Sequence, residues 1–251
     1  MVQRALLPTT STIPDVEISS SYHAAAQTGG DWFGYHHDAH AHQLYLYVGD
    51  VSGHGFGSAL LTGVVCGATQ AHRLTAGRPE PGGRPEARLR QLASVLDQVV
   101  LETGREELVM SMVLVGIDLA TGEGLCLNAG HNFPLHVRSA DGEVKVLAVP
   151  GPRLGEGAGR ALRPRRFQLE RGDLLFFYTD GLVENVGPDG RALPMKELYA
   201  LLRAVRDDEQ PNAAILARAR AIWREAPARD DVTTLVVRYK GPGAAEQTRV
   251  A

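Results

Sequence analysis

The sequence predicts a single domain of the α+β class, and three observations lead to this prediction. The chain has 251 residues, of which 44% are hydrophobic and 22% charged, values typical of one globular domain with a substantial core. Strand-like segments cluster along the chain while helical segments come in pairs, whereas a parallel α/β protein would alternate them regularly. We find no repeat of fixed period and no linker long enough to separate two domains.

Eight segments have the composition of strands. In QLYLYV at 43–48, Leu44 and Leu46 fall on one face and Tyr45 and Tyr47 on the other, which predicts a strand covered on both faces. Three further segments are rich in β-branched and aromatic residues, at 109–117, 174–179 and 232–239. Shorter candidates, separated by Gly, Pro or Asp, lie at 122–130, 133–138, 143–149 and 165–170.

Four segments are predicted to be helical. Over 57–74 the apolar residues recur at helical spacing, and we expect this stripe to face the core. Its members are Phe56, Leu60, Val64, Ala68 and Ala71. Three further amphipathic segments each follow or begin beside a proline suited to the first helical turn. They lie at 86–102, 195–206 and 212–224.

The ends of the chain, its charge and its cysteines exclude several classes of protein. Residues 1–15 are predicted to form a flexible arm and residues 241–251 a flexible tail, which leaves 16–240 as the domain. The net charge of -3 gives no field that would gather nucleic acid. Cys66 and Cys126 lie in apolar stretches, so a disulfide scaffold is excluded. No segment approaches ~18 consecutive apolar residues and no signal-peptide pattern is present, so we expect a cytoplasmic protein without membrane insertion.

Four aspartates carry the strongest functional signal. Asp50 and Asp180 each end an apolar strand near glycine, Asp31 lies in the Gly-rich segment TGGDWFG, and Asp230 opens the last strand. One such Asp-Gly pair would most often be a turn, but four acids buried together would cost several kcal/mol each unless cations balance them. Oxygen ligands suit Mg²⁺ or Mn²⁺, and two ions ~3.5–4 Å apart can hold a phosphoryl group and deliver a bridging hydroxide. The pattern predicts a dinuclear, metal-assisted phosphoester hydrolase.

Six motifs occur in a fixed order between about Ser20 and Tyr239. They are GGDWFG, GDVSGHG, LNAGHNFPL, GPRLG, GDLLFFYTDGLVE and RDDVTTLVV. In this order they resemble the metal-dependent protein serine/threonine phosphatases (PPM, or type-2C), specifically the bacterial SpoIIE-like branch. The resemblance implies an αββα sandwich, in which two antiparallel sheets face one another with a helix pair outside each. The predicted placement of the helix pairs agrees with it.

The resemblance also implies a role for each aspartate. Asp50 would bridge two ions, and the backbone carbonyl of Val51 would bind the second of them. Asp180 and Asp230 would bind the first ion, and Asp31 would act through metal-bound water. The cofactor implied is therefore a pair of Mn²⁺ or Mg²⁺ ions.

This chain departs from the eukaryotic branch of the family at two places. There, a His two residues after the bridging Asp can donate a proton, whereas here that position is Ser52 and His54 lies two residues further on. His54 and metal-bound water are both candidate proton donors. The eukaryotic branch also has an Arg ahead of the first acidic motif that grips phosphate, and this chain has none there. Metal, backbone N–H groups, Arg153 or Arg229 would have to take that role.

Other conspicuous residues are expected to be structural. Four histidines in one predicted hairpin suggest a transition-metal site, but a solvated loop is the favoured interpretation for His36, His37, His40 and His42. His131 could line the site, but a buried, hydrogen-bonded turn residue is the favoured interpretation. Glu184 is expected to be structural, and Asp231 to support Asp230. A run of arginines is expected to form a solvated strand edge that an acidic partner could use; it comprises Arg160, Arg163, Arg165, Arg166 and Arg171.

The predicted function is metal-dependent hydrolysis of phosphoserine or phosphothreonine on a regulatory protein. Resemblance to the SpoIIE-like branch implies that the substrate is a phosphorylated anti-sigma-factor antagonist in a bacterial partner-switching pathway. Control would come from an activating partner that acts on the helices at 57–74 and 86–102, or from an upstream sensor. Two alternatives stay open: a catalytically silent binding module of the same fold, and a hydrolase of small phosphoesters with a closed pocket.

Overall fold

The computed structural model of the protein describes residues 6–8, 13–26, 28–53, 55–77, 79, 83–105 and 107–243, except for the side chains of residues 159 and 160. Within these residues the strands are β1 Val16–His23, β2 Trp32–Asp38, β3 Gln43–Val51, β4 Met110–Asp118, β5 Glu123–Ala129, β6 Leu135–Val137, β7 Val144–Val146, β8 Arg165–Gln168, β9 Leu174–Tyr178 and β10 Val232–Tyr239. The helices are α1 Phe56–Thr75, α2 Glu86–Gly104, α3 Ala158–Ala161, α4 Gly181–Glu184, α5 Met195–Ala204 and α6 Pro211–Trp223.

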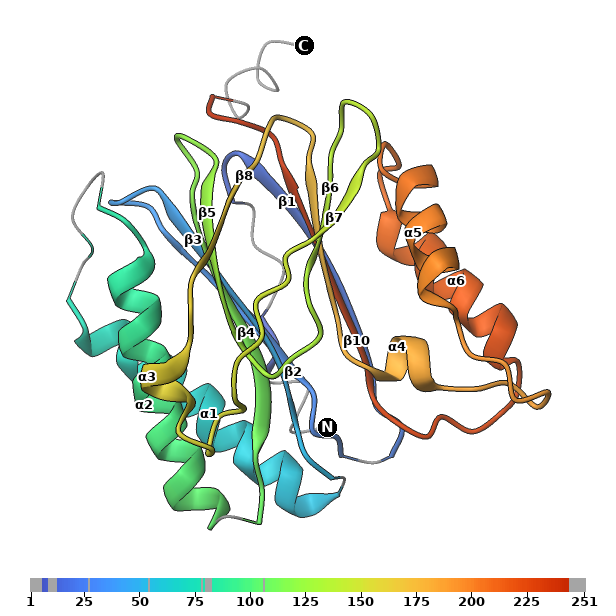
Figure 1. The fold of residues 1–251 in the computed structure, drawn as a ribbon, viewed down its shortest axis with the longest axis horizontal. Coiled ribbons are helices and arrows are strands. Elements are labelled where there is room, and N and C mark those ends of the chain that lie inside the picture. The colour runs from blue at the N-terminus through green and yellow to red at the C-terminus, as the bar shows by residue number, and fades with distance from the viewer. Residues whose placement is uncertain are drawn as a thin grey trace.

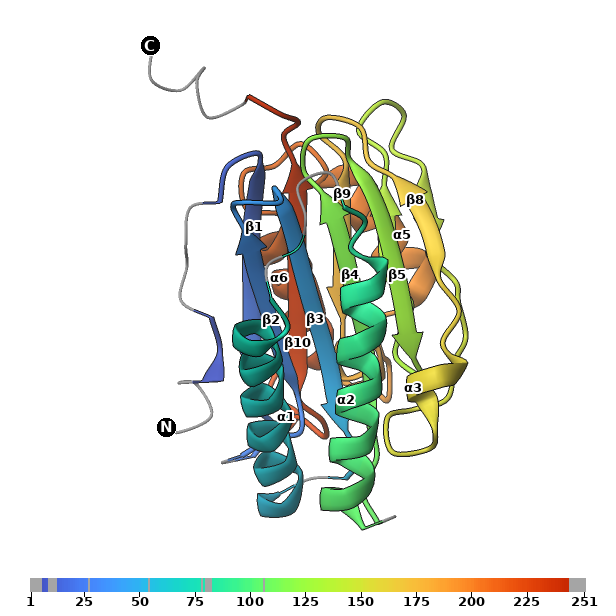
Figure 2. The ribbon, with the colours of Figure 1, turned by 90° about the vertical axis from the view of Figure 1, so that its left-hand side faces the viewer.

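Two five-stranded antiparallel sheets face one another and form the centre of the molecule (Figure 1). The strand order is β1-β10-β9-β6-β7 in one sheet and β2-β3-β4-β5-β8 in the other. Helices α5 and α6 cover the outer face of the first sheet, while α1 and α2 cover that of the second (Figures 1 and 2). This four-layered αββα arrangement confirms the predicted α+β class.

Three apolar clusters hold the layers together. Between the sheets, Leu44 and Leu46 of β3 pack in one cluster with Phe177 of β9. Tyr45 and Tyr47 point to the opposite face of β3 and join the cluster under α1 and α2. A third cluster joins α5 and α6 to the first sheet. The central strands are apolar on both faces because each face is covered, by the other sheet or by helices.

The eight segments predicted to be strands correspond to β3 to β10, and the four predicted helices to α1, α2, α5 and α6. Strands β1 and β2 were not assigned from their composition. The segment VEISSSYH of β1 is largely polar, and it pairs with β10 along its full length from Val16↔Tyr239 to His23↔Val232. An outer strand of this kind is stabilised by the ladder of its neighbour, so its own composition carries little strand signal.

The buried face of α1 differs from the predicted one. Phe56 is 79% exposed and Leu60 56% exposed, so the predicted apolar stripe does not face the core. The buried face instead carries small and polar residues together with a few apolar ones: Ser58, Leu61, Thr62, Val65, Cys66, Thr69 and His72. The two faces have the same helical spacing, and the hydroxyl groups of Thr62 and Thr69 can be buried because each bonds a backbone carbonyl one turn earlier.

The predicted N-terminal arm packs on the domain where the structure describes it. The carbonyl of Leu6 accepts a hydrogen bond of 3.2 Å from Trp32 Nε1, and Leu6 and Leu7 lie against the cluster under α1 and α2. Ile13 is buried between the sheets. Residues 1–5 and 9–12 of the arm and residues 244–251 of the tail lie outside the described residues, so the predicted domain bounds stay a prediction.

Helix length and hydropathy together decide whether a segment could cross a membrane. None of the helices that the structure describes is both long and apolar enough to do so.

Candidate metal centre and active site

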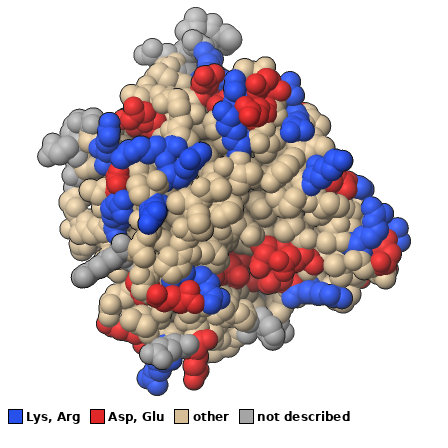
Figure 3. Space-filling model, viewed as in Figure 1, with Lys and Arg blue, Asp and Glu red and all other residues tan. Residues whose placement is uncertain are grey.

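Three of the predicted aspartates meet at one end of the sandwich. Asp50 is the penultimate residue of β3, Asp180 comes two residues after β9, and Asp230 two residues before β10. Since β9 and β10 are antiparallel neighbours, the end of one lies beside the start of the other. Asp50 reaches the same place from the facing sheet. Figure 3 shows acidic side chains gathered near this end of the molecule, beside the position of α4 in Figure 1.

A cavity of about 320 Å³ opens between these acids. Its walls come from both sheets and from the loops that follow β3 and β5. The lining residues are Asp50, Ser52, Gly53, Val109, Ser111, Gly130, His131, Asn132, Arg153, Asp180 and Asp230. Most of the lining is polar, as a site for an anionic substrate and cations requires.

The carboxylate of Asp50 lies at the centre of the acidic group. Burial, together with the negative charges of Asp180, Asp230 and Asp231, raises the pKa of Asp50 to about 8. Burial and the charge of Glu184 raise the pKa of Asp180. The Oδ1 atom of Asp180 is buried without a hydrogen-bond partner among the described residues. A divalent cation beside these oxygens would offset both the repulsion and the missing partner.

Asp31 lies deeper, with only 1% of its surface exposed. Its Oδ2 accepts a hydrogen bond of 2.8 Å from the hydroxyl of Thr179 and one of 2.6 Å from that of Thr233. Burial and the charge of Asp50 raise the pKa of Asp31 well above its usual range, although the two hydroxyls oppose this shift. The hydroxyls therefore fix the orientation of a carboxylate that belongs to the same charge cluster as Asp50.

Gly30 leaves room for oxygen atoms beside Asp50. A Cβ atom at this residue would lie 2.7 Å from Asp50 Oδ1 and 2.7 Å from the carbonyl oxygen of Val51. These two predicted ligand atoms thus border a common space that only glycine keeps open. The carbonyl of Gly30 is held in place by Thr62 Oγ1 at 2.9 Å and by the N–H of Val51 at 3.3 Å.

The neighbouring aspartates 230 and 231 have separate surroundings. Asp230 lines the cavity, whereas Asp231 is buried and accepts a 2.8 Å hydrogen bond from the N–H of Ala25. A Cβ atom at Gly29 would lie 1.6 Å from Asp231 Oδ2, so this loop packs directly on the carboxylate. Asn185 shapes the backbone at Asp230, because its amide donates to the Asp230 carbonyl at 2.9 Å and its oxygen accepts from the Asp230 N–H at 3.1 Å.

His131 is held rigidly at the wall of the cavity. Asn128 bonds both the N–H and the carbonyl of His131, at 2.8 and 2.9 Å, and Ser111 Oγ lies 2.8 Å from its Nδ1. Burial lowers the pKa of His131 to about 4, so the ring is neutral at physiological pH. His131 is thus the buried, hydrogen-bonded turn residue that we expected, and it also lines the cavity.

Of the two arginines considered for phosphate binding, Arg153 lines the cavity. Its guanidinium already pairs with Glu156, with Nη2 2.6 Å from Oε1, and about half of the side chain is exposed. The absence of a side chain at Gly130 makes room for Arg153, since a Cβ there would lie 2.5 Å from its Cγ. Arg229 is exposed and is not among the lining residues.

The proposed proton donor His54 lies outside the described residues. Its neighbour Gly53 lines the cavity, and so does Ser52. The Ser52 hydroxyl accepts a hydrogen bond of 3.1 Å from the N–H of Val109, while the Ser52 N–H donates to the Val109 carbonyl at 2.9 Å. This pair of bonds fixes the loop that carries the residues after Asp50.

The hairpin between β2 and β3 does not gather its histidines into a metal site. His42 Nε2 lies 3.0 Å from Asp15 Oδ2, and the ring of His36 stacks on Tyr45 with centroids 6.3 Å apart. The rings of His37 and His42 meet edge to face. His40 is exposed at the turn. No group of three or more His, Cys, Asp or Glu side chains in the described part of the chain could hold a metal ion as it stands.

The carboxylates around Asp50 are also among the described side chains, so they too include no group of three that could hold one metal ion as they stand. As the side chains stand, an ion would take at most two ligands from carboxylates and the remainder from the Val51 carbonyl and water, a coordination common for Mg²⁺. A third carboxylate could reach the same ion only if its side chain rotated. The donor atoms are all oxygens, as Mg²⁺ and Mn²⁺ prefer, and the unpartnered Asp180 Oδ1 and the space beside Gly30 fit such an ion.

Several residues of the site were not predicted from the sequence. Thr179 and Thr233 looked like ordinary strand residues, and Asn185 like part of a turn. The sequence hints at them only through their positions. Thr179 directly precedes Asp180, Thr233 lies two residues after Asp231, and Asn185 follows Glu184. Ser111 lies opposite Asp50 in the β3–β4 ladder, which no single-sequence pattern reveals.

Comparison with known proteins identifies the family of this chain. Residues 40–240 match the family described as Stage II sporulation protein E (SpoIIE). Phosphoserine phosphatase RsbP of Bacillus subtilis is 25% identical over 169 residues, which cover 67% of this chain and 40% of RsbP. Protein IcfG of Synechocystis is 23% identical over 81% of this chain and 34% of its own length. The chain thus spans less than half the length of these curated relatives.

Solved structures share the fold. The RsbU and RsbW domains of Rv1364c from Mycobacterium tuberculosis superpose with a TM-score of 0.71 at 28% identity, over 92% of this chain and 61% of that one. The SiaA-PP2C domain of Pseudomonas aeruginosa superposes with a TM-score of 0.78 at 22% identity, over 95% and 93% of the two chains. The family match confirms the resemblance predicted from the motifs, and the structural matches confirm the αββα fold.

Proposed function

This chain belongs to the SpoIIE family of metal-dependent protein serine/threonine phosphatases, and on that premise we propose that it hydrolyses phosphoserine or phosphothreonine on a regulatory protein with two Mn²⁺ or Mg²⁺ ions. The observation that carries the proposal is that Asp50, Asp180 and Asp230 line one cavity, where burial and the neighbouring negative charges raise the pKa of Asp50 to about 8. Acids placed at such cost are expected where cations bind during function.

Each acidic residue has a proposed task. Asp50 would bind both ions, with the Val51 carbonyl on one of them. Asp180 and Asp230 would bind the other, which requires rotation of one of these side chains, and Asp31 would act through a water molecule. When bound, the ions would neutralise the carboxylates, polarise the phosphoryl group and lower the pKa of a water molecule.

The residues around the acids would bind and protonate the substrate. Arg153 would exchange part of its pairing with Glu156 for a substrate phosphate oxygen, since it is the arginine that lines the cavity. His54 is proposed to donate the proton to the leaving serine or threonine oxygen, because its neighbour Gly53 lies at the cavity wall. The neutral ring of His131, fixed by Ser111 and Asn128, would hold the cavity wall rigid.

The proposed substrate is a phosphorylated anti-sigma-factor antagonist of a bacterial partner-switching pathway. Its support is analogy: one relative is named a phosphoserine phosphatase, and one structural neighbour combines an RsbU domain with an RsbW domain. An activating partner or an upstream sensor is proposed to control the site. The exposed Phe56 and Leu60 at the start of α1, only a few residues after Asp50, support control through that helix.

The test is hydrolysis of p-nitrophenyl phosphate and of a phosphoserine peptide with Mn²⁺, Mg²⁺ or chelator. We expect turnover that requires metal and is lost in Asp50→Asn and Asp180→Asn, whereas Asp207→Asn, a change of an exposed aspartate that does not line the cavity, keeps it. Calorimetric titration with Mn²⁺ separates the alternatives. Metal binding without turnover by the folded protein would favour the binding module, and turnover of the small phosphoester alone would favour a small-molecule hydrolase.

A further inference from the structure

A second cavity, of about 390 Å³, lies between the outermost strands of the two sheets. β7 ends the strand order of one sheet and β8 that of the other, and residues of both line this cavity, which we call the edge groove. An outermost strand pairs on one side only, so its other row of backbone N–H and C=O groups is available to an added strand. Among the described strands, β7 and β8 each present such a row, because each is the last strand of its sheet.

Cations surround the edge groove. Arg138 and Lys145 come from the β6–β7 hairpin, and Arg165 and Arg166 from β8. Figure 3 shows basic side chains over both regions of this face. Arg138 and Lys145 share one carboxylate, Glu143, at 3.0 and 3.5 Å, and Arg166 pairs with Glu86. Two carboxylates, Glu170 and Asp173, also line the groove, and Asp141 lies 3.4 Å from Arg138. No ion pair within the described part of the chain engages Arg165, so the lining residues themselves carry four cations against two carboxylates.

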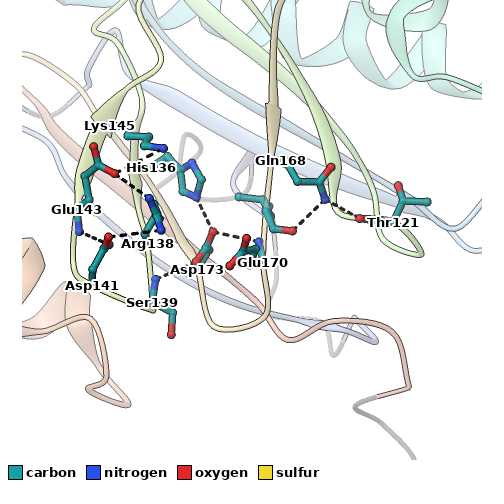
Figure 4. A network of polar contacts seen from close by, with 11 residues as sticks. Thr121, His136, Arg138, Ser139, Asp141, Glu143, Lys145, Gln168, Glu170 and Asp173 are labelled. Atoms are coloured by element: carbon teal, nitrogen blue, oxygen red, sulfur yellow. Dashed lines mark hydrogen bonds and ion pairs between the residues drawn. The ribbon is translucent and has the colours of Figure 1, made fainter.

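The floor of the edge groove is rigid. Asp173 is buried there and accepts three hydrogen bonds, from His136 Nε2 at 2.6 Å, from the N–H of Ser139 at 2.8 Å and from the N–H of Glu170 at 3.0 Å (Figure 4). These bonds tie the β6–β7 hairpin to the turn between β8 and β9. A groove fixed in this way loses little entropy when a ligand binds, which favours its use as a recognition surface.

Apolar side chains lie between the cations. Val146 on β7 is 37% exposed, and the partly buried ring of Phe167 on β8 contacts His136 with centroids 6.4 Å apart. We propose that the edge groove binds an extended, acidic segment of a protein partner, with carboxylates on Arg165 and Lys145 and one apolar side chain between Val146 and Phe167. The backbone rows of β7 and β8 favour an extended segment, and the charge favours an acidic one.

The edge groove is separate from the metal centre. Asp173 precedes β9 and Asp180 follows it, so the five residues of this strand lie between the two sites, roughly 17 Å at the usual rise per residue. A partner held there would leave the cavity around Asp50 open. The proposal goes beyond the proposed function and does not depend on it, because peptide binding can be measured without turnover.

The test uses a fluorescein-labelled ten-residue peptide of Glu and Asp with one central Val, and fluorescence anisotropy on the full chain without metal. Lys145→Glu combined with Arg165→Glu is expected to weaken binding by about tenfold or more. Lys196→Glu, a reversal of one charge at an exposed position of α5, is expected to leave it unchanged. Circular dichroism and urea unfolding check that each variant is folded.

A second measurement locates the peptide. Hydrogen exchange is expected to show slower exchange of backbone amides in β7 and β8 when the peptide is added, and unchanged exchange around Asp50. The proposal is overturned if the unmodified chain does not bind the peptide, if the double variant binds as tightly as the unmodified chain, or if Lys196→Glu weakens binding equally. Equal affinity for the same peptide with Lys in place of Glu and Asp would also overturn it.

Discussion

The hydroxyl of Thr233 donates a 2.6 Å hydrogen bond to Asp31 Oδ2, and through it β10 of one sheet is tied to the residue that precedes β2 of the other. Thr179 completes the arrangement by donating to the same oxygen and accepting from the N–H of Thr233 at 2.9 Å. A carboxylate of the candidate metal centre is therefore oriented by the junction between the two sheets, so the stability of the fold and the geometry of the site depend on the same hydrogen bonds.

We expect Thr233→Val to lower the free energy of unfolding by about 1–3 kcal/mol, because it removes a donor from a buried carboxylate. Apparent Mn²⁺ affinity should fall too, since Asp31 loses part of its orientation. Urea unfolding and calorimetric metal titration measure these effects. Thr234→Val is the matched control: its buried hydroxyl has no partner among the described residues, so this variant should be as stable as the unmodified chain or more stable. Equal losses in both variants would contradict the role assigned to the hydrogen bond.

The raised pKa of Asp50 predicts a dependence of stability on pH in the metal-free protein. The pKa rises from 3.8 to about 8 on folding, so ionisation of Asp50 opposes folding. The stabilising contribution of the protonated form is complete below pH 3.8, declines as the pH rises and is lost above about 8. Asp50→Asn should therefore gain stability relative to the unmodified chain as the pH rises from about 4 to 8. Thermal unfolding of both proteins in chelator tests this, and a constant difference would contradict it.

Metal binding should show the opposite dependence. Because Mn²⁺ needs the ionised carboxylate, its affinity should increase with pH until Asp50 is ionised, with protons released on binding. Calorimetry in two buffers of different ionisation enthalpy measures the number of protons released. Release of no protons at pH 6 would contradict the assignment of Asp50 as a ligand.

Arg153 is expected to contribute to phosphate binding. Arg153→Ala should lower kcat/KM for a phosphoserine peptide by about 10- to 100-fold, the effect of losing a hydrogen bond to a charged group. Arg229→Ala, an equal truncation of an exposed arginine outside the cavity lining, should change it little. Steady-state kinetics at saturating Mn²⁺ measures both variants. A larger loss in Arg229→Ala would transfer the role to that residue.

The space beside Gly30 should be essential for metal binding. In Gly30→Ala the new methyl group would lie 2.7 Å from both Asp50 Oδ1 and the Val51 carbonyl, so these oxygens must move. We expect a loss of calorimetric Mn²⁺ binding. Gly67→Ala is the control, since its added methyl group meets open space on α1 and should raise stability by about 0.5–1 kcal/mol. Normal Mn²⁺ binding by Gly30→Ala would show that this space holds no ion.

Local chemistry explains which parts of the fold could be predicted. Strands such as β3 and β10 were found because both their faces are buried, so apolar and β-branched residues fill them. The outer strand β1 was not found, because it is stabilised by its pairing with β10 and its own residues are largely polar. The face of α1 was predicted wrongly, since Phe56 and Leu60 have the helical spacing of a core stripe yet lie exposed. Periodicity gives a helix its faces, but only packing against the sheet decides which face is buried.

By itself, the sequence determined the α+β class, the order of the main strands and helices, and the four aspartates as the functional signal, because these follow from local composition and from motifs. The tertiary structure decided what surrounds those acids: that two threonines orient Asp31, that Gly30 leaves space beside Asp50, and that Arg153 lines the cavity while Arg229 does not. The physical reason is that pKa, burial and hydrogen bonding depend on neighbours brought together from distant positions, such as Asp31 and Thr233, and no local pattern in the chain records those contacts.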